Sequence, residues 1–224
     1  MNSLAIDTST NILSIALKWG ENYLETTCMI GLKHCETLMP LIKNLLDRAS
    51  ISPKKLDLVI CSAGPGSFTG LRIGMATSKG LALGIGCPLV SVSSLDMHVF
   101  SLNFFDGLVV PVIDARKKRL YTALYIKGRR ITDYLDIEEN ELFKMVEKYE
   151  HILFTGPDAC LFKSSVDGRK YFLDPGYNTG KGFYLIKLGI EKYNRVGPDR
   201  AEQGPLYVRK SDAEILHRKK ENCE

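Results

Sequence analysis

The 224-residue sequence predicts an α/β protein in which one βββαβαβ-type unit occurs twice in tandem. Two observations support this fold class. Residues 6–17 read IDTSTNILSIAL and residues 113–124 read IDARKKRLYTAL, so both fit the pattern I-D-x5-L-x2-A-L without a gap, 107 positions apart. The residues after each copy are also alike in kind, because alternating strand patterns come first and helical patterns come later.

The first unit is predicted to start with three strands and to continue with helices and strands in turn. From residue 34 the apolar residues form a broad sector at helical spacing, which is typical of an amphipathic helix. Pro40 fits the first turn of this helix or marks a kink in it. The predicted elements are strands over 3–8, 11–18 and 22–29, a helix over 34–49, a strand over 56–62, a helix over 70–84 and a strand over 88–92.

The second unit repeats this order. The run LYTALYI places every second residue from Leu120 to Ile126 on one face, as a strand does. The run EENELFKMVEKY has apolar residues at helical spacing and glutamates early, where the helix dipole favours them. The predicted elements are strands near 108–114, 119–127 and 130–135, a helix over 138–149, strands over 151–155 and 170–173, and a helix near 181–193.

Two such units in tandem predict the duplicated ribonuclease-H-like architecture that actin, sugar kinases and Hsp70-type ATPases share. The boundary is expected near 100–107, at FSLNFFDG, which gives a first domain over 1–103 and a second over 104–224. Residues beyond 204 are expected to form a last helix that packs back on the first domain.

Composition excludes several classes of protein. The chain is 45% hydrophobic and 25% charged, as is usual for a globular protein with a core, and its net charge is only +4. The basic clusters RKKR at 116–119 and HRKK at 217–220 are short, and a solvated face or a frayed end explains them better than a nucleic-acid site does. The six cysteines form no CxxC pair, and no apolar stretch is long enough to span a bilayer. Without a signal-like start, the chain is expected in the cytoplasm.

The sequence GPGSFTGLRIG, residues 64–74, joins a predicted strand to a predicted helix. Its glycine spacing is GxGxxxG, and it follows the fourth strand instead of the first, so it does not fit a dinucleotide-binding turn. It also lacks the lysine that ends a Walker A loop. Neither phosphate-binding interpretation therefore fits this loop.

The helix after this loop carries Gly70, Gly74, Ser78 and Ala82 at intervals of four, which forms one stripe of very small side chains. A glycine inside a helix costs about 1 kcal/mol relative to alanine, so these positions need a compensating contact. A small stripe allows another backbone to approach closely. Two interpretations stay open: the stripe and the preceding apolar helix belong to the core, or part of this surface binds another protein.

Several segments in order resemble the TsaB (YeaZ) family, and the resemblance covers essentially the whole chain. The most specific segment is GPGSFTGLRIGMATSKGLA, which starts at residue 64. The other segments are LAIDTST near the start, HCETLMPLI at 34–42, VSVSSLDMH at 90–98, VVPVIDAR at 109–116, LYTALY at 120–125 and GPLYVRKSDAE at 204–214.

The resemblance implies the two-domain actin-like fold and a role without catalysis of its own. Family members pair with a TsaD-type transferase through helices of the first domain. Together with a TsaE-type ATPase they support transfer of a threonylcarbamoyl group onto the adenine beside the tRNA anticodon. The implied partners are thus the transferase, the ATPase and, indirectly, tRNA, with a homodimer through the same surface when the transferase is absent. ATP and metal are expected on the partner subunits, and no cofactor is expected on this chain.

The resemblance also implies where the partner binds. The expected interface residues are Leu38, Met39, Leu41, Ile42, Leu45, Gly70, Leu71, Arg72, Gly74, Met75, Ser78 and Lys79. The expected structural Gly-rich loop comprises Gly64, Pro65, Gly66, Ser67, Phe68 and Thr69.

The residues that would carry chemistry are incomplete. TsaD-like enzymes are similar to one another in having two metal-binding histidines four positions apart, and the matching positions here are Ser94 and His98. A serine hydroxyl is a poor transition-metal ligand, so His98 is expected to be a helix-end or surface histidine. Asp7 and Asp114 occupy the strand ends where actin-like ATPases bind nucleotide, but Arg116 follows where small residues are needed. A non-catalytic subunit is favoured over the alternative, a stand-alone kinase of small molecules or a metal-dependent glycoprotease.

Overall fold

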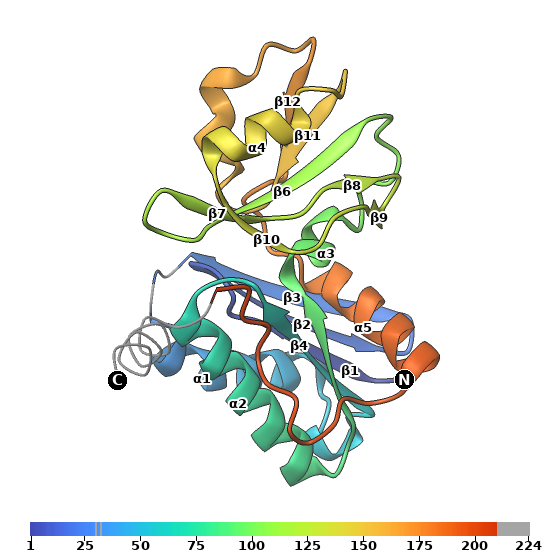
Figure 1. Cartoon of the computed structure of the whole chain (residues 1–224). Coiled ribbons are helices and arrows are strands. Elements are labelled where there is room, and N and C mark those ends of the chain that lie inside the picture. Colours follow the sequence, from blue (N-terminus) through green and yellow to red (C-terminus); the bar gives the residue numbers. More distant parts are fainter. Residues whose placement is uncertain (30, 32, 210–224) are drawn as a thin grey trace, which may run out of the picture.

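The computed structural model describes residues 1–29, 31 and 33–209, which form two sheets with helices packed against them (Figure 1). None of the helices in the described ranges combines the length and the apolar character that crossing a bilayer demands. Each sheet comes from one copy of the sequence repeat. The α/β fold class predicted from that repeat is confirmed.

The first sheet has the strand order β3-β2-β1-β4-β5. Its first two neighbouring pairs are antiparallel hairpin pairs, while β4 and β5 extend it in parallel to β1. The strands are β1 (Ser3–Asp7), β2 (Ile12–Trp19), β3 (Asn22–Met29), β4 (Leu58–Gly64) and β5 (Leu89–Ser93).

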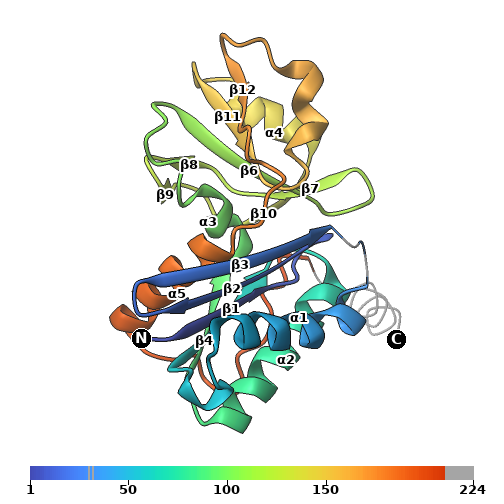
Figure 2. The same cartoon turned by 180° about the vertical axis from the view of Figure 1, so that it is seen from behind.

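Helices cover both faces of this sheet (Figure 2). On one face, Leu4 and Ile6 of β1 pack in a core with α1 (His34–Ala49), and α2 (Phe68–Ile85) lies beside it. On the other face, Ala5 packs with α5 (Gly182–Val196). Successive residues of a strand point to opposite faces, so this short apolar strand is buried on both sides.

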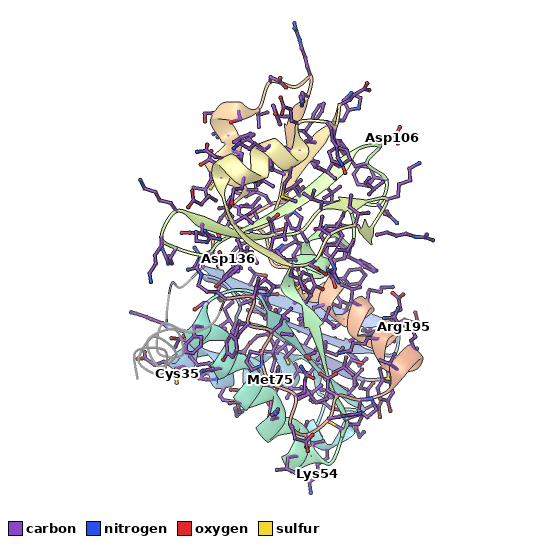
Figure 3. The ribbon with its side chains drawn as sticks, in the orientation of Figure 1. Cys35, Lys54, Met75, Asp106, Asp136 and Arg195 are labelled. Atoms are coloured by element: carbon purple, nitrogen blue, oxygen red, sulfur yellow. The ribbon has the colours of Figure 1, made fainter. Side chains whose placement is uncertain are left out.

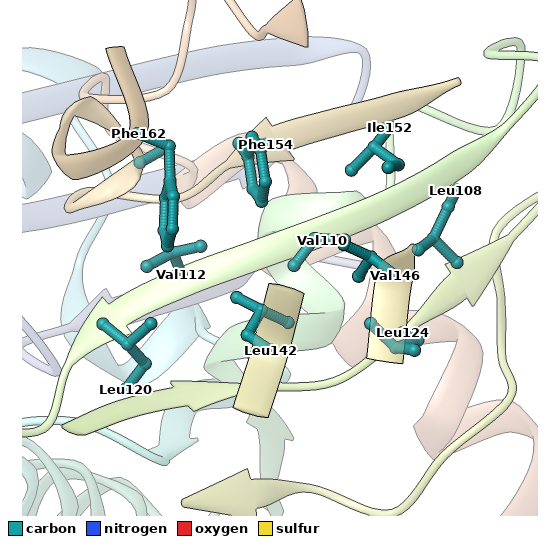
Figure 4. Close-up of a cluster of buried hydrophobic side chains, with 11 residues drawn as sticks. Leu108, Val110, Val112, Leu120, Leu124, Leu142, Val146, Ile152, Phe154 and Phe162 are labelled. Carbon is teal, nitrogen blue, oxygen red and sulfur yellow. The ribbon is translucent and has the colours of Figure 1, made fainter. Parts of the chain in front are cut away.

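The second sheet repeats the same arrangement, with the order β10-β7-β6-β11-β12. Again a hairpin pair is antiparallel and two strands continue the sheet in parallel. Figure 4 shows its core, in which Phe154 and Phe162 stack with ring centroids 4.4 Å apart. The strands are β6 (Leu108–Asp114), β7 (Arg119–Thr122), β10 (Leu135–Glu138), β11 (Ile152–Thr155) and β12 (Tyr171–Leu173).

Shorter elements complete the fold. The helix α4 (Glu139–Val146) begins with a capping box in which the side chains of Glu138 and Glu141 bond each other's backbone. The remaining elements are α3 (Ser94–Val99), a small hairpin of β8 (Tyr125–Ile126) and β9 (Arg129–Arg130), and the 3₁₀ turns Pro53–Lys55 and Ala159–Ser165.

The structure differs from the predicted elements in the second unit. The predicted strand over 119–127 breaks into β7 and β8, and the third main strand is β10, which begins where the predicted strand over 130–135 ends. The left-handed residues Lys127 and Gly128 make a tight turn that diverts the chain into the small hairpin. α3 is absent from the predicted elements, because its 6 residues are too few to show a helical period.

The end of the chain returns to the first sheet. α5 packs on β1, β4 and β5, although division at residue 103 assigned it to the second domain. The extended segment after it is tied to the same sheet, since Leu206 N donates to Ala63 O (2.7 Å). A helix was predicted beyond residue 204, but residues 204–209 are not helical, and the rest of that prediction lies outside the described residues.

Candidate functional site

The Gly-rich loop runs from the end of β4 into α2 and lies against the turn between β1 and β2. Ser67 N donates to Ser9 O (2.6 Å), and a Cβ on Gly66 would lie only 2.2 Å from that same oxygen. Ser67 also caps α2 by accepting from Gly70 N, so the helix begins at Phe68, two residues earlier than predicted. These contacts lie within the chain, so the glycines allow two of its own segments to approach closely.

The small stripe on α2 faces the same turn. A Cβ on Gly70 would lie 2.1 Å from Thr8 O, and one on Gly74 would lie 2.2 Å from Thr8 Oγ1. Ser78 is fully buried. The interpretation that this stripe receives a partner's backbone is therefore wrong, because Thr8 of the same chain already occupies the space.

Most of the other predicted interface residues are also buried in the chain's own core. The reason is that the apolar sector of α1 packs on the first sheet, as an amphipathic helix normally does. Met39 and Arg72 reach the surface, and Leu41 and Lys79 reach it in part. The buried residues, which are corrected here from interface to core, are Leu38, Ile42, Leu45, Leu71 and Met75.

The outward face of α2 carries a second small stripe, which was not among the predicted interface residues. Ala76, Gly80 and Gly84 are exposed, and no atom of the described residues lies within 4 Å of a Cβ built on either glycine. Leu83 beside them is 86% exposed, and on the neighbouring α1 Met39 is 48% exposed. This stripe is offset by two residues from the buried one, or about 200° around the helix. The signal was present in the sequence as a second i, i+4 series.

Both copies of the repeat use their aspartate in the same way. Asp7 Oδ1 accepts from Ser9 N (2.9 Å), and Asp114 Oδ1 accepts from Arg116 N (2.7 Å), so each carboxylate closes the turn after its strand. Burial raises the pKa of Asp7, and Arg116 pairs with Asp114 at 3.6 Å. Both aspartates therefore have a structural role in their turns, and Asp114 also forms an ion pair with Arg116.

The two residues at the positions that match the metal ligands of TsaD-like enzymes, Ser94 and His98, are both buried inside the protein. Ser94 Oγ donates to Pro65 O in the Gly-rich loop. His98 lies in the last turn of α3 and is 3% exposed, so it is a buried histidine near a helix end and not a surface one. Neither ring nitrogen of His98 has a hydrogen-bond partner within the described part of the chain. Among the described residues, no three His, Cys, Asp or Glu side chains gather where they could hold a metal ion.

His98 makes stability depend on pH. Burial, and next the charge of Lys181, lower the pKa of His98 from 6.5 to about 3. Between about pH 6.5 and 3 the His98 imidazole is therefore protonated in the unfolded chain and neutral in the folded one. The free energy of unfolding should fall as pH drops below about 6.5, by at most about 1.4 kcal/mol per pH unit. Urea titrations at pH 7.5 and 5 should show a smaller loss in His98→Leu than in the wild type. Exposed His151→Leu is the control, and equal losses in all three would contradict the assignment.

Known proteins share this duplicated arrangement. The family model described as TsaD, tRNA N6-adenosine threonylcarbamoyltransferase, matches residues 30–194. This match and the two repeated sheets place the chain in the class of TsaD-like proteins. The tRNA threonylcarbamoyladenosine biosynthesis protein TsaB of Bacillus subtilis is 33% identical over 96% of both chains. That of Haemophilus influenzae is 30% identical over 92% of this chain and 82% of the relative.

A solved structure agrees with these relatives. YeaZ from Pseudomonas aeruginosa superposes with a TM-score of 0.76 at 25% identity, covering 92% of this chain and 99% of that one. The chain belongs to the TsaB family.

Proposed function

We propose that this protein takes part in the synthesis of threonylcarbamoyladenosine in tRNA, as a subunit that binds and supports a TsaD-type transferase and has no catalysis of its own. The names of its relatives support the pathway. The single observation that supports the non-catalytic role is the state of Ser94 and His98: the first is bonded to Pro65 O, and the second is buried.

The partner-binding surface is the outward face of α1 and α2. Gly80 lies in mid-helix, where glycine costs about 1 kcal/mol relative to alanine, and no contact within the described chain requires it. A close-approaching helix would compensate for this cost. Leu83 and Met39 supply exposed apolar area, and Arg72 adds a charge at one end. The same face would serve a homodimer when the transferase is absent.

The remaining parts of the proposal concern the assembly. A TsaE-type ATPase is the third subunit, ATP and metal are held by the partner subunits, and tRNA reaches this chain through the complex in the cytoplasm. A tRNA modification assay with all subunits should lose its product when this protein is left out. Isothermal titration of the isolated chain with ATP should give no heat; tight binding or unaided turnover would favour a stand-alone enzyme instead.

Gly80→Leu tests the surface. The new side chain points away from the described residues, so the chain should fold, but it should fail to elute with a TsaD-type transferase in size-exclusion chromatography. Lys144→Leu adds a leucine at an exposed position of α4 and should leave the complex intact. Normal complex formation by Gly80→Leu would refute this surface.

A further inference from the structure

The turn between β6 and β7 contains three basic residues whose backbone has a positive φ, a conformation that residues other than glycine rarely adopt. Arg116, Lys117 and Lys118 are consecutive, exposed and left-handed, with φ of 62°, 56° and 60°. Ala115 N donates to Arg119 O (2.9 Å), and Arg119 N donates to Arg116 O (3.1 Å), and these two bonds hold the turn closed. Glycine or asparagine would suit these dihedrals better, so the dihedrals do not explain the three basic side chains, of which Arg116 pairs with Asp114 at 3.6 Å.

This turn borders a groove of about 580 Å³ between the two halves of the molecule. Among the described residues that line the groove, none is a carboxylate, and four are cations: Arg72, Arg116, Lys117 and Arg209. One cation is held in place by the second sheet, since Arg209 bonds both carboxylate oxygens of Asp136 (2.6 and 2.7 Å). Asp136 lies where the two halves meet (Figure 3).

Aromatic rings lie among these cations. Phe68 and Tyr207 are each 40% exposed, with ring centroids 5.1 Å apart. The Arg72 guanidinium lies 3.8 Å above the Phe68 ring and donates through Nε to the Tyr207 hydroxyl (3.0 Å). Tyr121 lines the groove as well. The ring faces are therefore pre-positioned, and their exposed area can stack against a flat ligand.

Cations beside exposed rings are the chemistry with which proteins bind single-stranded nucleic acid, because phosphates pair with the cations and bases stack on the rings. The volume fits a ligand the size of a nucleotide. An acidic protein segment would use the cations but would gain nothing specific from three aromatic rings. Charge and ring content together therefore favour a single-stranded nucleic acid.

We propose that this groove binds an unpaired RNA segment directly, with its phosphates on Arg116 and Lys117 and a base against Tyr121, Phe68 or Tyr207. The proposal rests on the proposed function for the choice of RNA over DNA and for the identity of that RNA, which would then be tRNA. It goes beyond that function, because the chain would touch the substrate instead of acting only through its partner.

Fluorescence anisotropy of a labelled, unmodified tRNA transcript with the full-length chain tests the proposal at several salt concentrations. The double variant Arg116→Gln/Lys117→Gln should bind about tenfold more weakly. Its slope of log K against log salt should fall by about 0.7 for each phosphate that no longer pairs with a cation. Tyr121→Leu should weaken binding about fivefold and leave the slope unchanged, because stacking carries no counterion release.

Lys127→Gln is the matched control, since Lys127 is an exposed lysine with a positive φ (49°) in another turn, and it should bind as the wild type does. Equal affinity and slope in the double variant and the wild type would overturn the proposal. So would a polyglutamate peptide that displaces the transcript and binds more tightly than it. Loss of RNA binding in the double variant, with normal binding of the transferase, would support this proposal whether or not Gly80→Leu upholds the partner surface.

Discussion

Gly70→Ala is expected to destabilise the protein by about 3 kcal/mol or more, although it adds only one methyl group. The added Cβ would lie 2.1 Å from Thr8 O, a backbone atom that cannot rotate away. Moving α2 outward would break the bond from Thr8 Oγ1 to Gly70 O (2.7 Å) and strain the bond from Ser67 N to Ser9 O. No small movement of α2 or of the β1–β2 turn therefore removes this overlap without breaking a hydrogen bond.

Gly80→Ala is the matched control in the same helix. No atom of the described chain lies within 4 Å of its Cβ, so the change should raise the free energy of unfolding by up to about 1 kcal/mol through helix propensity alone. Urea unfolding, followed by circular dichroism, measures both variants. If Gly70→Ala unfolded at the same urea concentration as the wild type, α2 would not be packed on the β1–β2 turn in the way described.

Glu25→Ala should destabilise the protein by about 2–3 kcal/mol, because it removes the cap that docks α5 on the first sheet. The Glu25 carboxylate accepts from Gly182 N (2.9 Å) and Phe183 N (3.2 Å), which are two amides of the helix N-terminus that lack a partner within the helix. It also accepts from Ser14 Oγ (2.8 Å) and from the Tyr23 hydroxyl. Alanine would leave all four donors without this acceptor.

Two further variants make the Glu25 experiment specific. Glu25→Gln keeps one acceptor oxygen and should cost less, about 1 kcal/mol. Glu21→Ala removes an exposed carboxylate from the same hairpin and should change nothing measurable. Urea unfolding gives the free energies, and hydrogen exchange of the α5 amides should be faster in Glu25→Ala. Unchanged exchange and stability would contradict the role of Glu25 as a cap.

The candidate partner surface shows why local pattern alone was insufficient. The i, i+4 series of Gly70, Gly74 and Ser78 marked a helix side that permits close approach, and the structure confirms that an approach occurs there. The approaching segment, however, is Thr8, which lies 62 residues before Gly70 in the chain. Periodicity identifies the sides of a helix, but it does not say which side another part of the same chain will cover.

The sequence by itself determined the duplicated α/β architecture, most strand and helix positions of the first unit, and the family, since alternation, helical periodicity and repeated motifs are local properties. Only the tertiary structure decided which face of α2 is buried and that α5 packs on the first sheet. It also decided that Arg72 bonds Tyr207, which lies 135 residues later in the chain. These outcomes depend on contacts between distant segments, whose free energy comes from jointly buried surface and is not encoded in any short stretch.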